Sequence, residues 1–151
     1  MRTTYRVFAF IIAAEVVVQA SMMAFAVAGL GVWIDKDGGL LDKATMESDL
    51  DFTGAVGFAI HGMNGMMLIP LIALIFLIIS FFAKVPGGIA WAATVFGLVV
   101  LQVALGLFGH ENAIFGLLHG INALAVFSVA LMAGKRVSSV AAPTSGERAT
   151  A

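Results

Sequence analysis

Cysteine is absent from this chain of 151 residues, and charged residues are scarce. Without cysteine the protein has no disulfide bond, iron–sulfur cluster, thiolate zinc site or cysteine nucleophile, and three histidines remain as its only good nitrogen ligands. Charged residues make up 11% of the chain and hydrophobic residues 61%, whereas a soluble domain carries roughly a quarter charged residues. The net charge of −1 provides no basic surface for nucleic acid. The composition therefore argues against a soluble enzyme and against a nucleic-acid-binding protein.

Four long apolar runs make up most of the chain. They span about residues 7–30, 56–82, 89–108 and 113–133, and only one charged residue, Glu15, lies inside them. Each run has about 20 residues or more, which is enough to cross a bilayer core as a helix. In lipid the backbone of each run must form its hydrogen bonds within its own segment. The sequence therefore predicts an all-α fold, a four-helix transmembrane bundle, with residues 1–137 as one membrane domain.

Lysine and arginine predict how the bundle is oriented, because they favour the cytoplasmic side of short loops. The cations that flank the runs at one end are Arg2, Arg6, Lys84, Lys135 and Arg136. We therefore expect both termini in the cytoplasm and the acidic loop 31–55 outside. The tail 138–151 is rich in Ala, Ser, Thr and Pro and is expected to be a disordered cytoplasmic segment. The expected location is the bacterial plasma membrane, as a multi-pass protein.

A short polar motif occurs twice in the apolar runs. Residues 59–65 read Ala-Ile-His-Gly-Met-Asn-Gly, and residues 117–123 read Leu-Leu-His-Gly-Ile-Asn-Ala. A weaker echo places Gln19 and Gln102 at matching points of the first and third runs. The pattern indicates two helical hairpins of one type, whose second helices run in parallel. A polar side chain inside lipid costs free energy unless it is paired, so the repeated residues are expected to face the bundle interior.

The two repeated histidines lie at matching depths. His61 is about eight residues into its run and His119 about six, which places both roughly 10 Å below the outer surface. In an up-down bundle with short loops, their two helices stand diagonally across the core, so the histidines can point at each other. Asn64 and Asn122 follow three residues later on the same helix faces. Small residues that leave room for a flat macrocycle surround the histidines: Gly57, Gly62, Gly65, Gly116, Gly120 and Ala123.

This arrangement favours bis-histidine ligation of haem, because haem iron takes two axial ligands on opposite faces of its ring. In this interpretation His61 and His119 are the axial ligands of one haem b. The other ring nitrogen of a ligating histidine needs a partner that fixes its tautomer. The candidate partners are Asn64, Asn122, Gln19 and Gln102. His110, at the outer end of the third run, is read as an interfacial histidine that would contact a haem propionate if the haem edge points outward.

Three alternatives stay open. In a cofactor-free structural subunit, the histidines and asparagines would simply form hydrogen bonds between helices. Copper is a minor alternative, since thioethers suit Cu(I). The methionines near the same level are Met22, Met23, Met63, Met66 and Met67. A proton-coupled carrier would use Glu15 together with Gln19, because carboxylates within membrane spans often mark proton paths.

The pattern Leu101-Gln102-x-x-Leu105-Gly106, followed by Leu117-Leu118-His119 and Ala123, resembles one half of heme A synthase. This resemblance covers about half of the chain. That family is built from two four-helix halves, each with a histidine pair on its second and fourth helices. The resemblance therefore implies that His61 and His119 are haem ligands and, by analogy, that the chain forms a homodimer. Over nearly its whole length the chain is also similar to small four-helix actinobacterial membrane proteins of unknown function.

The sequence departs from heme A synthase at two positions near the first histidine. Phe58 stands where the family has a glutamate, and Gly62 stands where it has an arginine. The resemblance thus implies haem binding without enzymatic haem modification, and we expect no catalytic residues. The predicted function is a small b-type membrane cytochrome, for electron transfer or as an accessory to a respiratory or haem-handling complex. Two filled axial positions favour electron transfer over oxygen activation.

Overall fold

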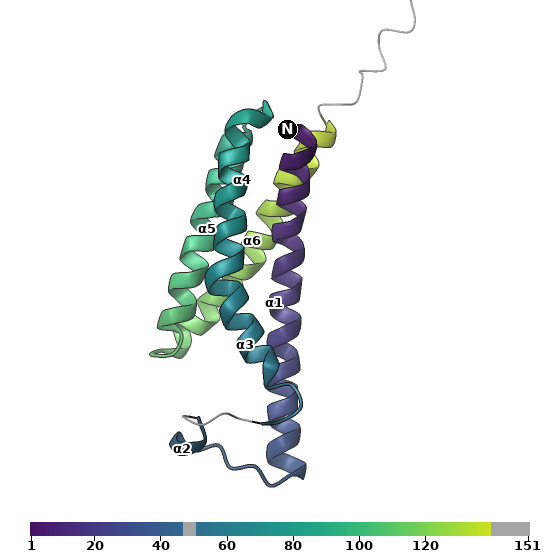
Figure 1. Cartoon of the computed structure of the whole chain (residues 1–151). Coiled ribbons are helices and arrows are strands. Elements are labelled where there is room, and N and C mark those ends of the chain that lie inside the picture. The colour runs from purple at the N-terminus through teal and green to yellow at the C-terminus, as the bar shows by residue number, and fades with distance from the viewer. Residues whose placement is uncertain (47–50, 140–151) are drawn as a thin grey trace, which may run out of the picture.

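Four long helical rods dominate the computed structural model, which describes residues 1–46 and 51–139 (Figure 1). The elements are α1 (Arg2–Lys36), α2 (Lys43–Met46), α3 (Val56–Met63), the π-helix η1 (Asn64–Leu68), α4 (Ile69–Ala83), α5 (Gly88–Phe108) and α6 (Ala113–Ser139). Elements α3, η1 and α4 follow one another without a break and form the second rod. Each rod is long and apolar enough to cross a membrane, and the described residues contain no strand. The all-helical prediction is confirmed, and the four apolar helices indicate a multi-pass membrane protein.

The first helix is longer than its apolar run. Helix α1 has 35 residues, about 52 Å at 1.5 Å per residue, and it reaches beyond α5 and α6 at one end (Figure 1). The predicted loop 31–55 is therefore helical at residues 31–36 and again in α2. Of the predicted tail 138–151, only residues 138 and 139 lie within the described residues, and they end α6.

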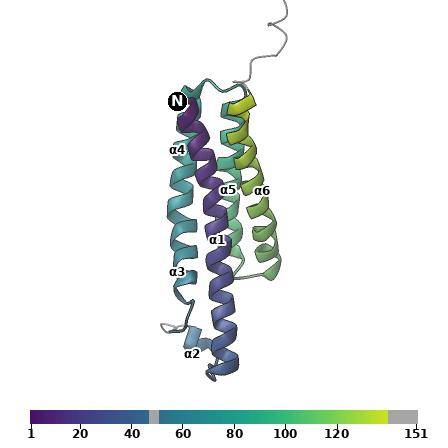
Figure 2. The same ribbon diagram turned by 90° about the vertical axis from the view of Figure 1, so that its right-hand side faces the viewer.

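Each rod packs against two neighbours. Helix α1 contacts α4 and α6, and α5 contacts the same two helices, so the second rod and α6 stand diagonally across the bundle (Figures 1 and 2). The start of α1 and the end of α6 lie at the same end (Figure 1). There the Tyr5 hydroxyl donates to the Gly88 carbonyl oxygen at 3.0 Å, and the Arg2 guanidinium donates to the Lys84 carbonyl oxygen at 3.1 Å. We call this the basic end, because it carries Arg2, Arg6, Lys84, Lys135 and Arg136, and the opposite end the loop end.

The buried core fills the half of the bundle near the basic end. Its fully buried members come from residues 5–13 of α1, 69–83 of α4, 92–99 of α5 and 126–133 of α6. Many of them are alanines, which let helices approach closely. Toward the loop end, Ala26 is the one further hydrophobic residue that is buried among the described residues. The bundle is therefore tightly packed along only part of its length.

Close backbone contacts hold α1 against the chain that enters α3. A Cβ atom on Gly29 would overlap the Thr53 carbonyl oxygen, and one on Gly57 would overlap the Met22 carbonyl oxygen. Because these two glycines have no side chain, the backbone of the second rod and the segment before it can contact the backbone of α1 directly. This contact sets where the start of α3 lies, and with it the position of His61.

Substitution of Gly29 by alanine tests this contact. We expect Gly29→Ala to lower the free energy of unfolding by about 1–3 kcal/mol, as overpacking does in a filled site. Gly31→Ala is the matched control, because it lies on the same helix and no atom lies within 4 Å of its added Cβ. Alanine is favoured over glycine inside a helix by up to about 1 kcal/mol, so the control should be neutral or stabilised. Thermal unfolding in detergent, followed by circular dichroism, measures the stability of both variants. An equal change of stability in Gly29→Ala and Gly31→Ala would contradict the close backbone contact at Gly29.

Candidate functional site

His61 and His119 face each other across the bundle. Their ring centres lie 6.0 Å apart with an angle of 58° between the planes, and both side chains are half-buried. His61 comes from α3 and His119 from α6, which are the diagonal rods. Two imidazoles that bind the same metal ion from opposite sides, at about 2.0–2.1 Å, have ring centres roughly 6 Å apart. The separation of the two ring centres is therefore compatible with a shared metal ion.

A reciprocal pair of hydrogen bonds orients His119. Its Nδ1 lies 3.0 Å from the backbone carbonyl oxygen of Gln102, and the Gln102 carboxamide donates to the His119 carbonyl oxygen, also at 3.0 Å. Asn122 completes the set, because its Nδ2 donates to Gln102 Oε1 at 2.7 Å and to the Leu98 carbonyl oxygen at 2.9 Å. A carbonyl oxygen only accepts hydrogen bonds. The contact therefore requires the proton on Nδ1 and leaves the lone pair on Nε2.

The same contacts recur around His61. Its Nδ1 lies 3.3 Å from the Gln19 carbonyl oxygen. The Gln19 carboxamide satisfies its neighbours when its nitrogen faces His61: it then donates to the His61 carbonyl oxygen at 3.1 Å, and its oxygen accepts from Asn64 Nδ2 at 3.0 Å. In that orientation the carboxamide nitrogen also lies 2.6 Å from His61 Nδ1. His61 Nδ1 thus lies beside both an acceptor, the Gln19 carbonyl oxygen, and a donor, the Gln19 carboxamide nitrogen. Binding of a metal at Nε2 would select the tautomer in which Nδ1 donates to the carbonyl oxygen.

The Gln19 carboxamide also accounts for the π-helix. In the same orientation its oxygen accepts from the Gly65 amide at 3.1 Å, while its nitrogen bonds the His61 carbonyl oxygen. His61 and Gly65 are four residues apart, so a regular α-helix would join these two backbone groups directly. A side chain inserted there widens the turn, and η1 begins at Asn64. Helix α6 runs without such a turn through the second motif.

Glu15 distinguishes the two hairpins. Its carboxylate accepts from Asn64 Nδ2 at 2.8 Å, where the Leu98 backbone carbonyl accepts in the other hairpin. The sequence placed Glu15 with Gln19 and Asn64 beside His61, but the contact between Glu15 and Asn64 was not predicted. The signal was present, because Glu15 precedes Gln19 by the four residues that separate Leu98 from Gln102. Asn64 Oδ1 is buried with no hydrogen-bond partner among the described residues.

Other predicted residues lie outside this hydrogen-bonded layer. His110 is exposed in the turn between α5 and α6. Gly120 is also exposed, and a Cβ added there would meet no atom within 4 Å. Of the methionines proposed for copper, the three on the second rod face outward, because Met63, Met66 and Met67 are 69%, 57% and 71% exposed. Met22 and Met23 lie on α1 and are half-buried.

The protein offers only a small set of metal ligands here. Within residues 1–46 and 51–139 no three His, Asp or Glu side chains gather at one point. Two imidazoles fit the axial positions of haem iron, since the macrocycle itself supplies the remaining ligands. The histidines also lie on the loop side of the packed core, which begins seven to eight residues further along each rod, at Ile69 and Val126. The residues present therefore fit a haem better than an ion held by protein alone.

The comparisons with known proteins add no relative to this picture. No protein-family model, curated protein or solved structure matches the chain.

The tautomer of His119 provides a test of the site that needs no cofactor. We expect its ring proton on Nδ1, because the Gln102 carbonyl oxygen can only accept. Nitrogen NMR of histidine-labelled protein in detergent, with resonances assigned by single variants, distinguishes the two ring nitrogens. His110, which is exposed, is the control and should exchange between tautomers as a solvated histidine does. A His119 ring protonated on Nε2 alone would contradict the hydrogen bond.

Proposed function

We propose that this protein is a small b-type membrane cytochrome that holds one haem between α3 and α6. His61 and His119 are the axial ligands in this proposal. The observation that carries it is the pair of imidazoles with centres 6.0 Å apart, each with Nδ1 against a backbone carbonyl of the preceding rod. A ligating histidine almost always donates its other ring N–H to such an acceptor, which fixes the ring and raises its basicity.

The surrounding residues suit a buried, low-dielectric site. Gln19 and Gln102 each bond the backbone carbonyl of the opposing histidine, so the carboxamides hold the helices that carry the ligands. Apolar side chains line α3 and α6 on the loop side of the pair, among them Phe58, Leu117 and Leu118. When bound, haem iron would take up and release one electron, and two filled axial positions favour that role over oxygen activation. The chain itself would orient the ligands and keep water away.

Several features of the wider proposal follow from the sequence. The matching hydrogen bonds in the two hairpins support a duplicated hairpin, as in the halves of heme A synthase that the sequence resembles. The cations of the basic end favour a cytoplasmic location for both termini in a bacterial plasma membrane, with the haem toward the outer side. The partners would be a respiratory or haem-handling complex, or a second copy of the chain. A cofactor-free subunit would use the same hydrogen bonds only to join helices, at about 0.6–2 kcal/mol for each pair.

The visible spectrum of each histidine variant tests the ligands. We expect the purified protein, oxidised and then reduced with dithionite, to show a shifting Soret band and sharp α and β bands. His61→Ala and His119→Ala should each lose this six-coordinate spectrum, because either change removes one axial ligand, while circular dichroism shows the helices retained. His110→Ala is the control and should keep the spectrum. A flat spectrum in the unmodified protein, even after haem is added back, would leave the cofactor-free subunit as the function.

The glutamines provide a second, graded test. We expect Gln102→Leu to weaken haem binding by about 10–100-fold, the usual effect of losing a group that orients a metal ligand. Gln19→Leu should act similarly and should also remove the inserted carboxamide from the π-turn. Haem titration of the apoprotein measures both affinities, and Ser128→Ala on the exposed face of α6 is the control. Unchanged affinity in both glutamine variants would show that the carboxamides do not support the ligands.

A further inference from the structure

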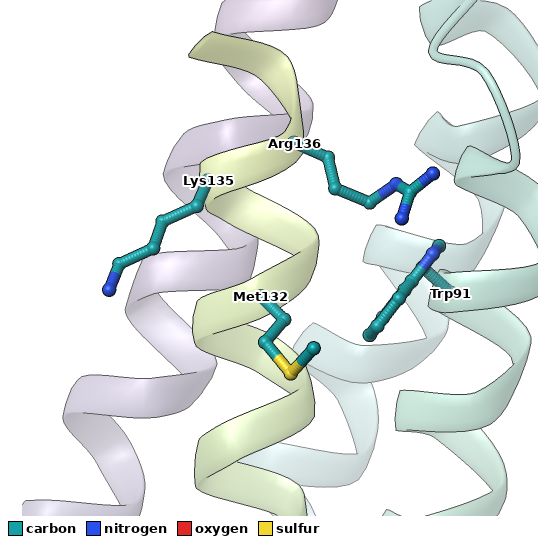
Figure 3. Close-up of a pocket in the computed structure, with 4 residues that line it drawn as sticks. All are labelled: Trp91, Met132, Lys135 and Arg136. Carbon is teal, nitrogen blue, oxygen red and sulfur yellow. The ribbon is translucent and has the colours of Figure 1, made fainter. Parts of the chain in front are cut away.

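A groove between α5 and α6 at the basic end combines an apolar wall with cationic and donor groups. It has a volume of about 250 Å³ and is lined by Trp91, Met132, Lys135 and Arg136. Figure 3 shows Met132 and the Trp91 ring on its apolar side, with Arg136 reaching over from α6 and Lys135 extending away from Trp91 at the rim. We propose that this groove binds one anionic phospholipid, with the phosphate at Arg136 and Trp91 and an acyl chain along Met132.

The polar end of the groove presents groups that suit a phosphate. The Arg136 guanidinium carbon lies 5.2 Å from the centre of the Trp91 ring, and the ring nitrogen of Trp91 lies on the Arg136 side (Figure 3). Guanidinium groups bind phosphate oxygens through several N–H donors at once. One phosphate can therefore accept from both side chains.

The charge around the groove favours an anion. Within residues 1–46 and 51–139, the side chains of Arg2, Arg6, Lys84, Lys135 and Arg136 lie at this end and no acidic residue does, since Glu15 lies within the span of α1. The first turn of α5 adds the positive end of a helix dipole. Gly87, which precedes α5, lies close to Arg136, because a Cβ added to it would lie 3.9 Å from a guanidinium nitrogen. The electrostatic field therefore attracts a negatively charged headgroup.

The depth of the groove favours a lipid over a free anion. Trp91 is the fourth residue of α5 and packs against the core, which is the position of interfacial tryptophans that anchor a helix at the headgroup level. Met132, which is 51% exposed, lies one turn further into the apolar span. Basic pockets between membrane helices bind anionic lipid headgroups in this way. The groove thus offers contacts to a phosphate and to an acyl chain together.

Native mass spectrometry of the full-length protein in detergent, titrated with dioctanoyl phosphatidylglycerol, tests the proposal. We expect the first lipid to bind, and Arg136→Gln to weaken its binding about tenfold, since a cation near the headgroup is worth about 1 kcal/mol or more. Arg6→Gln is the matched control, because Arg6 also stacks on a ring at the basic end, 5.5 Å from the centre of Phe10, but lies outside the groove. Lipid binding by Arg6→Gln should stay within about twofold of that of the unmodified protein, because Arg6 makes no contact with the groove.

Each other outcome overturns the proposal. Equal losses in Arg6→Gln and Arg136→Gln would mean that diffuse charge attracts the lipid. Equal binding of dioctanoyl phosphatidylcholine would mean that apolar contact suffices, and equally tight binding of inorganic phosphate would mean a free-anion site. If Arg136→Gln does not fold, Trp91→Phe decides, because it removes the N–H donor and keeps a ring. Trp33→Phe, at the loop end, is its control, and unchanged lipid binding in Trp91→Phe would contradict the predicted phosphate contact.

Discussion

The reciprocal pairing of a glutamine with a histidine in each hairpin is the interaction on which the site depends. Polar groups within a membrane span must find partners in the protein. Here the glutamine side chain bonds the backbone of the histidine, and the histidine ring faces the backbone of the glutamine. The pairing fixes the register of the two helices and the rotation of the imidazole together. Two such pairs on adjacent hairpins bring the rings to face each other across the bundle.

The hydrogen bonds around His61 and His119 follow the same pattern, but one of the accepting groups differs between the two hairpins. In the second hairpin Asn122 donates to a neutral backbone carbonyl, whereas in the first Asn64 donates to the carboxylate of Glu15. The first hairpin also contains the π-turn, and π-turns are frequent at functional sites. Any cofactor held between the two histidines would therefore have an ionisable group near one axial ligand and none in the matching place near the other. The site is therefore chemically asymmetric, although the repeated motif alone would make its two sides alike.

Hydropathy predicted the four rods, because backbone pairing in lipid leaves few structures other than a helix. The motif spacing also predicted that the histidines lie on diagonal rods, which up-down connectivity requires. Helix limits were less well predicted, since apolar runs follow the thickness of the bilayer and α1 continues past it to Lys36. The π-turn and the bonds to backbone carbonyls were missed. Both depend on how far a carboxamide reaches across to another helix, which residue spacing within one helix does not encode.

The uneven core links packing to the proposed function. In lipid, apolar side chains gain little by leaving the solvent, so helices associate mainly through packing and hydrogen bonds. The core supplies that packing near the basic end, whereas apolar side chains near the histidines, such as Leu117 and Leu118, remain exposed. A flat, rigid macrocycle ligated by the two histidines would add dispersion contacts to the half of the bundle that has few buried residues. Under the proposed function, binding of the cofactor would complete the packing of the half of the bundle near the loop end, while the two glutamines hold the ligands in place.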